Sequence, residues 1–189
     1  SLDGVGELFL RDVRVINGLL KEHDCMLMPT ATHPFMDPQR ETLLWERENR
    51  EIYQVFNSIF NCSGHGWSNL QSMHINLPFD GDEEFFRLHS AIRVMLPFIP
   101  ALAASSPFQD GAFTGMLDSR MDHYGRNSAK IPSVTGLIVP EPVSGIEDYH
   151  ASILAPLYRD LSPYDPGKVL QFEWSNARGA IARFERNAI

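Results

Sequence analysis

The spacing of apolar residues changes along this 189-residue chain, and that change limits the folds it can adopt. Four segments carry their apolar residues on one helical stripe, which predicts helices over residues 7–22, 40–60, 80–104 and 146–161. Shorter segments are typical of strands, at residues 25–28, 70–77, 168–175 and 180–184. Because these elements do not form regular β-α-β units, we predict an α+β domain with a mostly antiparallel sheet and helices on one side.

Prolines and a glycine-rich stretch interrupt this pattern. Pro97 and Pro100 lie inside the third helical segment, which predicts a kink or break near Met95. Residues 108–145 are rich in Gly, Pro, Ser and Thr and show little periodicity. An irregular segment of this length is typical of a functional loop or of a region that a ligand orders.

The strand predicted at residues 70–77 has two different faces. One face is apolar apart from Gln71 and belongs on the core. The other carries a hydroxyl, an imidazole and an amide, from Ser72, His74 and Asn76. Strand faces in plain solvent usually carry Lys, Glu or Thr, so this polar row is a candidate working surface.

Composition excludes several classes of function. The formal net charge of −8 argues against nucleic acid as a partner, because phosphate backbones are bound by basic stripes. The longest apolar stretch, Val94–Ala104, is too short to cross a membrane and contains two prolines. Cys25 and Cys62 form no C-x-x-C pair, which favours a reduced, cytoplasmic setting.

Arginines are the most informative charged residues. Arg120 lies in the irregular segment, and Arg178 and Arg183 lie near the C-terminal end. The planar guanidinium donates parallel hydrogen bonds to carboxylate and phosphate oxygens. Together with the polar strand face, these arginines would suit an anionic substrate and a nucleotide.

Histidines offer two alternatives. His74, on the polar strand face, is a candidate ligand-binding or metal-binding residue. Cys62 and His65 would be the thiol and imidazole of a thiol hydrolase, or the histidines would form a zinc site, although their spacing fits no regular zinc pattern. We regard the hydrolase as the weakest hypothesis.

Three blocks of the sequence resemble the glutamate–cysteine ligase family 2, the carboxylate–amine ligases. The family pattern begins with a T-H-P-F loop, which Thr32–Phe35 match, and an H-V-H-V strand, to which Gln71–Ile75 correspond. Its third block is A-L-S-A-S-S-P-x-x-x-G-x-x-T followed by S-x-R. This block corresponds to Ala101–Phe108 with Gly111, Thr114 and Ser119–Arg120. Further on, Trp174–Arg183 is similar to a stretch of the wider glutamine-synthetase superfamily.

The resemblance implies a glutamine-synthetase-like catalytic domain, in which a curved antiparallel sheet forms a funnel. It implies a ligase that joins glutamate to cysteine or a related amine through an acyl phosphate, as in glutathione biosynthesis. ATP and Mg²⁺ or Mn²⁺ would be the cofactors. Such chemistry depends on positioning and charge neutralisation.

The resemblance also assigns roles to individual residues. It implies a catalytic role for Arg120 and Arg178, nucleotide binding by Arg178 and Arg183, and metal binding by His74. It implies substrate binding by six residues: Thr32, His33, Ser72, Asn76, Thr114 and Arg120.

Two departures from the family pattern matter. Ser72 stands where the pattern has its first strand histidine, which removes one metal or phosphate ligand. The family's G-x-E-x-E and I-E-x-R strands lie outside residues 1–189, so we expect a single, incomplete catalytic domain with weak metal binding and little turnover on its own. A non-catalytic nucleotide- or amino-acid-binding domain with the same fold is the main alternative. An open sheet edge would suit pairing with a second copy.

Overall fold

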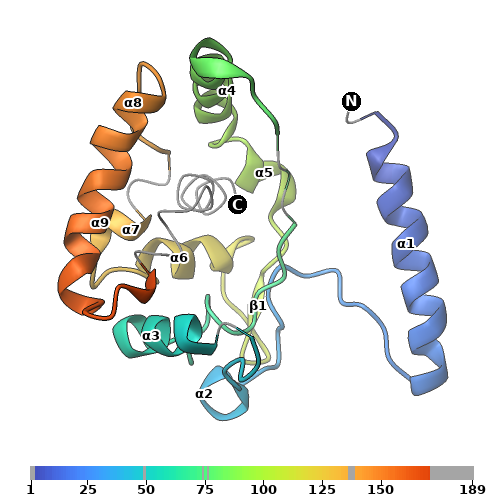
Figure 1. Ribbon diagram of the computed structural model, residues 1–189. Coiled ribbons are helices and arrows are strands. Elements are labelled where there is room, and N and C mark those ends of the chain that lie inside the picture. Colours follow the sequence, from blue (N-terminus) through green and yellow to red (C-terminus); the bar gives the residue numbers. More distant parts are fainter. Residues whose placement is uncertain (1–2, 49, 74, 76, 136–138, 171–189) are drawn as a thin grey trace. The chain divides into compact units, whose positions relative to one another are not determined.

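The computed structural model describes residues 3–48, 50–73, 75, 77–135 and 139–170, and Figure 1 traces their path. The chain divides into two compact units, Ser1–Thr30 and Ala31–Ile189. The strand predicted at residues 180–184 lies outside the described residues.

The first unit is an amphipathic helix with a short tail. Helix α1 spans Val5–Leu20 and continues as a 3₁₀ turn, Lys21–His23, which confirms the predicted helix. The strand predicted at residues 25–28 is wrong. The Cys25 amide donates to the Leu20 carbonyl (3.1 Å) and the Leu27 amide to Asn17 Oδ1 (2.8 Å), so this backbone is bonded to α1 and not to a neighbouring strand.

The helix predicted at residues 40–60 is half right. Its second half is α3, Arg50–Phe60, but the helix before it, α2, is a single turn, Pro38–Glu41, and residues 42–48 are not helical. Asp37 accepts from the Gln39 amide (3.1 Å) and Glu41 accepts from the Asp37 amide (2.7 Å), a reciprocal cap. Thr42 then turns to extended backbone, which ends the helix.

The third predicted helix is interrupted at its prolines. Helix α4 spans Gly81–Met95, and α5 spans Ile99–Ala103 after a turn. Proline donates no backbone N–H and clashes with the preceding turn, so Pro97 and Pro100 separate the two helices. The predicted break near Met95 is confirmed.

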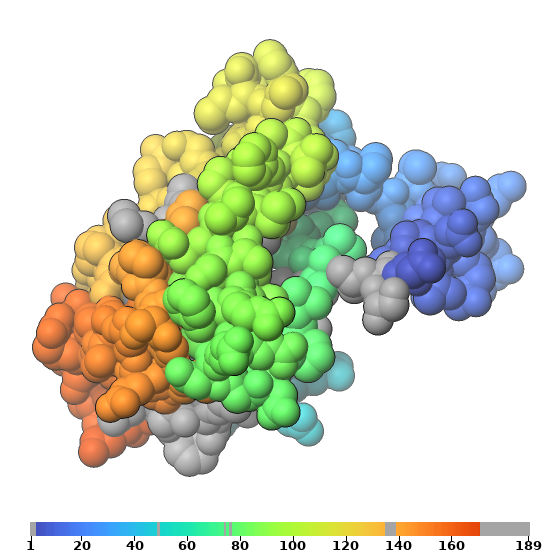
Figure 2. All heavy atoms as spheres, turned by 90° about the horizontal axis from the view of Figure 1, so that it is seen from above, coloured from blue at the N-terminus to red at the C-terminus, as the bar shows by residue number. Residues whose placement is uncertain are grey.

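The helix predicted at residues 146–161 is also confirmed, with a local widening. It consists of α8 (Ile146–Tyr149), a π turn (His150–Leu154) and α9 (Ala155–Leu161), followed by a 3₁₀ turn, Ser162–Tyr164. Its inner side packs on Phe85 of α4 through Tyr149, Ile153 and Leu154. Figure 2 shows α4 (green) in contact with these helices (orange).

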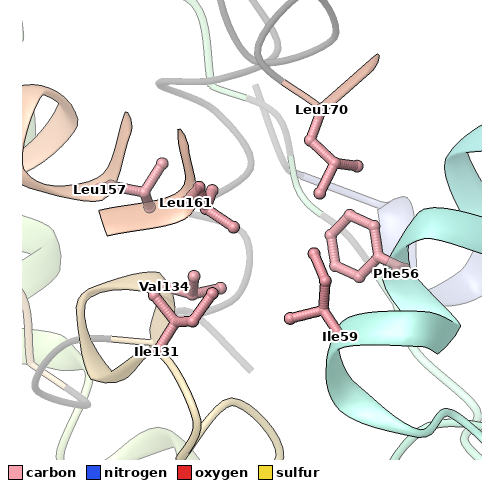
Figure 3. Packing of buried hydrophobic residues seen from close by; sticks show 7 residues of the cluster. All are labelled: Phe56, Ile59, Ile131, Val134, Leu157, Leu161 and Leu170. Atoms are coloured by element: carbon pink, nitrogen blue, oxygen red, sulfur yellow. The ribbon is translucent and has the colours of Figure 1, made fainter. Parts of the chain in front are cut away.

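The main core joins residues from distant parts of the second unit, including α7 (Pro132–Thr135). Figure 3 shows its seven buried members: Phe56, Ile59, Ile131, Val134, Leu157, Leu161 and Leu170. Trp67 stacks on Phe60 at its margin, with ring centroids 5.7 Å apart. The strand predicted to begin at residue 168 is wrong in its described part. Asp165 accepts from the amides of Val169 (2.9 Å) and Leu170 (2.8 Å), which starts a helical turn there.

Strand pairing in the described residues is limited to a hairpin and two isolated bridges. Strands β1 (Phe108–Gln109) and β2 (Ala112–Phe113) are antiparallel. The described residues are therefore compatible with the α+β class. The segment predicted as a strand at 70–77 forms, in its described part, only an antiparallel bridge between Thr32 and Leu70. None of the described helices combines the length and apolar character needed to cross a membrane.

A buried histidine makes stability depend on pH. His89 of α4 is 1% exposed and packs against the rings of Phe85 and Tyr149. Burial is the main cause that lowers the pKa of His89 from 6.5 to about 4. The charge of Arg93 lowers this pKa further, and that of Glu141 opposes the shift. Between these values the unfolded chain binds a proton that the folded chain excludes.

The free energy of unfolding should therefore fall as pH drops through that window, with roughly 2–3 kcal/mol lost to His89 by about pH 4.5. The variant His89→Leu should lose correspondingly less stability between about pH 7 and about pH 4.5. Urea unfolding of both proteins at both pH values tests this. An identical pH dependence would contradict it.

Candidate functional site

Three segments that are distant in sequence lie side by side in the second unit. The Ala31 amide donates to the Ser105 carbonyl (3.0 Å), and the Gln71 amide donates to the Ala31 carbonyl (2.9 Å). The His33 amide donates to the Asn69 carbonyl (3.0 Å). Backbone bonding therefore brings together the three blocks that carry the resemblance.

The hairpin turn is fixed to the T-H-P-F loop. Asp110 (φ 53°) and Gly111 (φ 74°) both have left-handed backbone, as a two-residue type I′ turn requires. The Gly111 amide donates to the Pro34 carbonyl (2.8 Å). An Asp-Gly dipeptide is a strong hairpin signal, and the sequence reasoning, which treated this region as irregular, missed it.

Two predicted substrate-binding residues organise their own loops. The His33 imidazole is exposed, and its Nδ1 accepts from the amides of Phe35 (3.2 Å) and Met36 (3.0 Å). If neutral, it therefore carries its proton on Nε2. The Thr114 hydroxyl lies 3.0 Å from the Pro107 carbonyl oxygen and 3.2 Å from the Met116 amide. Substrate binding by these two residues stays a prediction.

Arg120 lies in the first turn of an unpredicted helix, α6, Ser119–Arg126. Asp118 caps this helix, accepting from the Met121 amide (3.3 Å). The buried Ser106 hydroxyl donates to Asp118 Oδ1 (3.0 Å) and accepts from the Arg120 amide (3.1 Å). The start of α6 thus depends on the S-S-P segment, a tertiary contact with no local signal in the sequence.

The Arg120 side chain crosses from α6 to the predicted polar strand. The residue is 6% exposed; its Nη1 donates to the Gln71 carbonyl (2.6 Å) and its Nη2 to Ser72 Oγ (2.7 Å). Its Nε is buried without a hydrogen-bond partner in the described part of the chain. Burial lowers the pKa of Arg120, and Asp118 and Tyr124 oppose that effect. A guanidinium nevertheless stays charged at neutral pH.

Thr32 provides a second unsatisfied polar atom nearby in the fold. It is 5% exposed and bridges Leu70, two residues before Ser72, yet its Oγ1 has no hydrogen-bond partner among the described residues. A buried polar group without a partner costs about 1–3 kcal/mol unless water or a ligand bonds it. Ser72 itself is exposed, so the Arg120–Ser72 contact reaches the surface.

A pair of histidines joins the hairpin to α6; the sequence reasoning named only His65, and as a partner of Cys62. His65 Nε2 donates to Asp110 Oδ1 (3.1 Å), while Asn69 Nδ2 donates to His65 Nδ1 (2.8 Å). His123 Nε2 donates to Gln109 Oε1 (2.5 Å), and the two imidazoles lie 5.4 Å apart. Burial lowers the pKa of His123, and neighbouring His65 and Arg126 lower it further, against Asp122 and Asp110.

These contacts argue against the thiol-hydrolase hypothesis. Both ring nitrogens of His65 are engaged, by Asn69 and Asp110. Cys62 packs against the core cluster. His65 is therefore committed to the hairpin, and neither ring nitrogen is left to act as a base on the thiol.

The remaining predicted residues lie outside the described part of the chain: His74, Asn76, Arg178 and Arg183. Among the described residues, no group of three or more His, Cys, Asp or Glu side chains is placed to hold a metal ion. The metal and nucleotide roles stay predictions.

Comparison with known proteins identifies the class as a ligase family. The model of the glutamate–cysteine ligase family 2 matches residues 2–176, so the chain belongs to this family. No solved structure matches the chain.

Three curated relatives match the chain. An uncharacterized protein of Archaeoglobus fulgidus is 36% identical over 163 residues, covering 86% of this chain and 44% of the relative. Proteins named "Putative glutamate–cysteine ligase 2" are 27% identical in Cronobacter sakazakii (65% of this chain, 32% of the relative) and 26% identical in Solibacter usitatus (59% and 28%). The matched segments cover only 28–44% of the length of these relatives.

A substitution at Gly66 would test how closely α6 packs against the segment that carries His65. Gly66 has φ +87°, and an added Cβ would lie 2.6 Å from Asn127 Oδ1 and 2.8 Å from His123 Cβ. Gly81 has a similar φ of +74° but nothing within 4 Å, so it is a matched control.

We expect Gly66→Ala to lower the free energy of unfolding by about 2–4 kcal/mol, from clash and strain together, and Gly81→Ala by about 1 kcal/mol from strain alone. Urea unfolding of both variants measures the difference. Equal losses would show that the contact between Gly66 and α6 is looser than described.

Proposed function

We propose that this chain is part of an ATP-dependent carboxylate–amine ligase that joins glutamate to cysteine or a related amine through an acyl phosphate. Membership of glutamate–cysteine ligase family 2 supports a ligase, as do the names of two relatives. ATP and Mg²⁺ or Mn²⁺ are the proposed cofactors, in a cytoplasmic, glutamine-synthetase-like catalytic domain. The role proposed for the described residues is to bind the carboxylate substrate.

One observation carries this role: among the described residues the buried Arg120 Nε–H has no hydrogen-bond partner, while the two Nη atoms are held by Gln71 and Ser72. Those two bonds fix the plane of the fork. Charge-assisted bonds from a fixed guanidinium to a carboxylate are among the strongest that side chains form. A substrate carboxylate is therefore the ligand class that this group fits best.

The same arrangement would assist a reaction between anions. A ligase of this kind must hold glutamate close to a negatively charged phosphoryl donor. The Arg120 charge would offset their repulsion, and little reorganisation is needed because the group is already held in place. The exposed Ser72 hydroxyl lies next to Nη2, where it would meet an entering ligand.

Replacing Arg120 by Lys tests the fork and not merely the charge. In the protein at its full encoded length, Arg120→Lys should weaken L-glutamate binding by about 10- to 100-fold, because an ammonium cannot reproduce three fixed donors. Arg126→Lys is the matched control: it changes an exposed arginine of the same helix, which pairs with Asp122. Isothermal titration with L-glutamate measures both affinities.

Glutamate-dependent phosphate release from ATP, measured on the same proteins, tests the reaction itself. The control should keep its rate, and Arg120→Lys should lose most of it. Unchanged glutamate affinity in Arg120→Lys, with the protein folded by circular dichroism, would remove Arg120 from the site.

The non-catalytic binding domain is kept as a second candidate because of one contact. Ser72, in place of the family's histidine, serves as an acceptor for Arg120. A binding domain would show the same dependence of glutamate affinity on Arg120 but no glutamate-dependent phosphate release. The two measurements therefore separate the candidates.

A further inference from the structure

Asp118 is a negative charge only two residues from Arg120, yet the two do not form an ion pair. Its Oδ1 accepts from the Ser106 hydroxyl (3.0 Å) and from the Met121 amide (3.3 Å). None of the ion pairs in the described part of the chain joins Asp118 to Arg120. The carboxylate is therefore held in the helix cap, although a guanidinium lies in its neighbourhood.

Ser106 is hydrogen-bonded both to the Asp118 carboxylate and to the backbone amide of Arg120. It is 1% exposed, and its single hydroxyl hydrogen goes to Asp118 while its oxygen accepts from the Arg120 amide (3.1 Å). Its backbone is fixed as well: the Ser106 amide donates to Leu117 (3.0 Å) and its carbonyl accepts from the Ser119 amide (3.2 Å). The hydroxyl thus has one geometry available to it.

We propose that Ser106 is a positioning residue: by holding the Asp118 carboxylate in the α6 cap, it prevents an internal ion pair with Arg120 and keeps the guanidinium open to a ligand carboxylate. The ligand part of this proposal rests on the proposed function. A carboxylate in the same chain has a high effective concentration, so a released Asp118 would compete strongly with a free ligand. The buried Nε–H, for which the described part of the chain offers no acceptor, is the donor left available by this arrangement.

Two substitutions separate this role from simple structural support. Ser106→Ala removes one of the two hydrogen bonds that hold Asp118 Oδ1 and leaves only the long bond from the Met121 amide (3.3 Å), so Asp118 can turn toward Arg120. We expect L-glutamate binding to weaken by about tenfold or more. Adding Asp118→Asn should restore affinity to within about threefold of the wild type, because Asn also caps a helix but carries no charge. Structural damage from Ser106→Ala alone would not be repaired by that second change.

The experiment uses the protein at its full encoded length. Isothermal titration with L-glutamate compares the wild type, Ser106→Ala, Asp118→Asn and the double variant, with thermal melts to confirm folding. Without glutamate, the NMR signal of the Arg120 Nε–Hε group reports whether an internal carboxylate has paired with it. Ser152→Ala is the control: it removes an exposed serine-to-aspartate bond (2.6 Å to Asp148) that involves no arginine.

The expected result is an Nε–Hε signal that moves in Ser106→Ala and returns in the double variant, with glutamate affinity following it. An unmoved signal, or affinity that the double variant fails to restore, overturns the proposal. If Ser106→Ala does not fold, the Asp118→Asn variant alone is used as the test. A glutamate affinity equal to or above that of the wild type supports the proposal. A loss of affinity beyond about threefold overturns it, because Asn still caps the helix. If the signal behaves as expected but the wild type does not bind glutamate, the proposed function fails while the role of Ser106 stands.

Discussion

The second unit depends on the burial of one charged side chain. A guanidinium removed from water must be hydrogen-bonded, and Arg120 meets this requirement at the Gln71 carbonyl and the Ser72 hydroxyl. These bonds tie α6 to a segment almost fifty residues earlier in the chain. The segment is in turn bonded to Ala31, and Ala31 to Ser105, so the surrounding loops follow from the same constraint.

Sequence periodicity predicted the elements whose stability comes from a continuous apolar stripe. The helix at residues 146–161 and the second half of that at 40–60 bury Leu157, Leu161, Phe56 and Ile59 in one core. Sequence periodicity failed where polar contacts determine the backbone conformation. The cap at Asp37 closed α2 after one turn, and Asp165 started a helical turn where alternation predicted a strand.

The residue types of the candidate site were predictable from the sequence, but the contacts between them were not. Thr32, Ser72 and Arg120 could be chosen from residue chemistry and from the family resemblance. The hydrogen bond between Arg120 and Ser72 could not be predicted from the sequence. It depends on helix α6, whose cap is completed by Ser106, fourteen residues away from Arg120. The pairing of His65 with His123 is likewise a product of tertiary packing. Residue types indicate what a site can bind, and long-range bonding decides which of them meet.

The central claim is that the Arg120 Nε–H, which has no hydrogen-bond partner among the described residues, receives a substrate carboxylate. The most direct test is an experimental structure of the protein with L-glutamate bound. We predict a glutamate carboxylate within hydrogen-bond distance of Arg120 Nε, close to the hydroxyl of Thr32 or Ser72. Glutamate bound away from α6, or Arg120 Nε occupied by an acceptor of the protein itself, would contradict the claim.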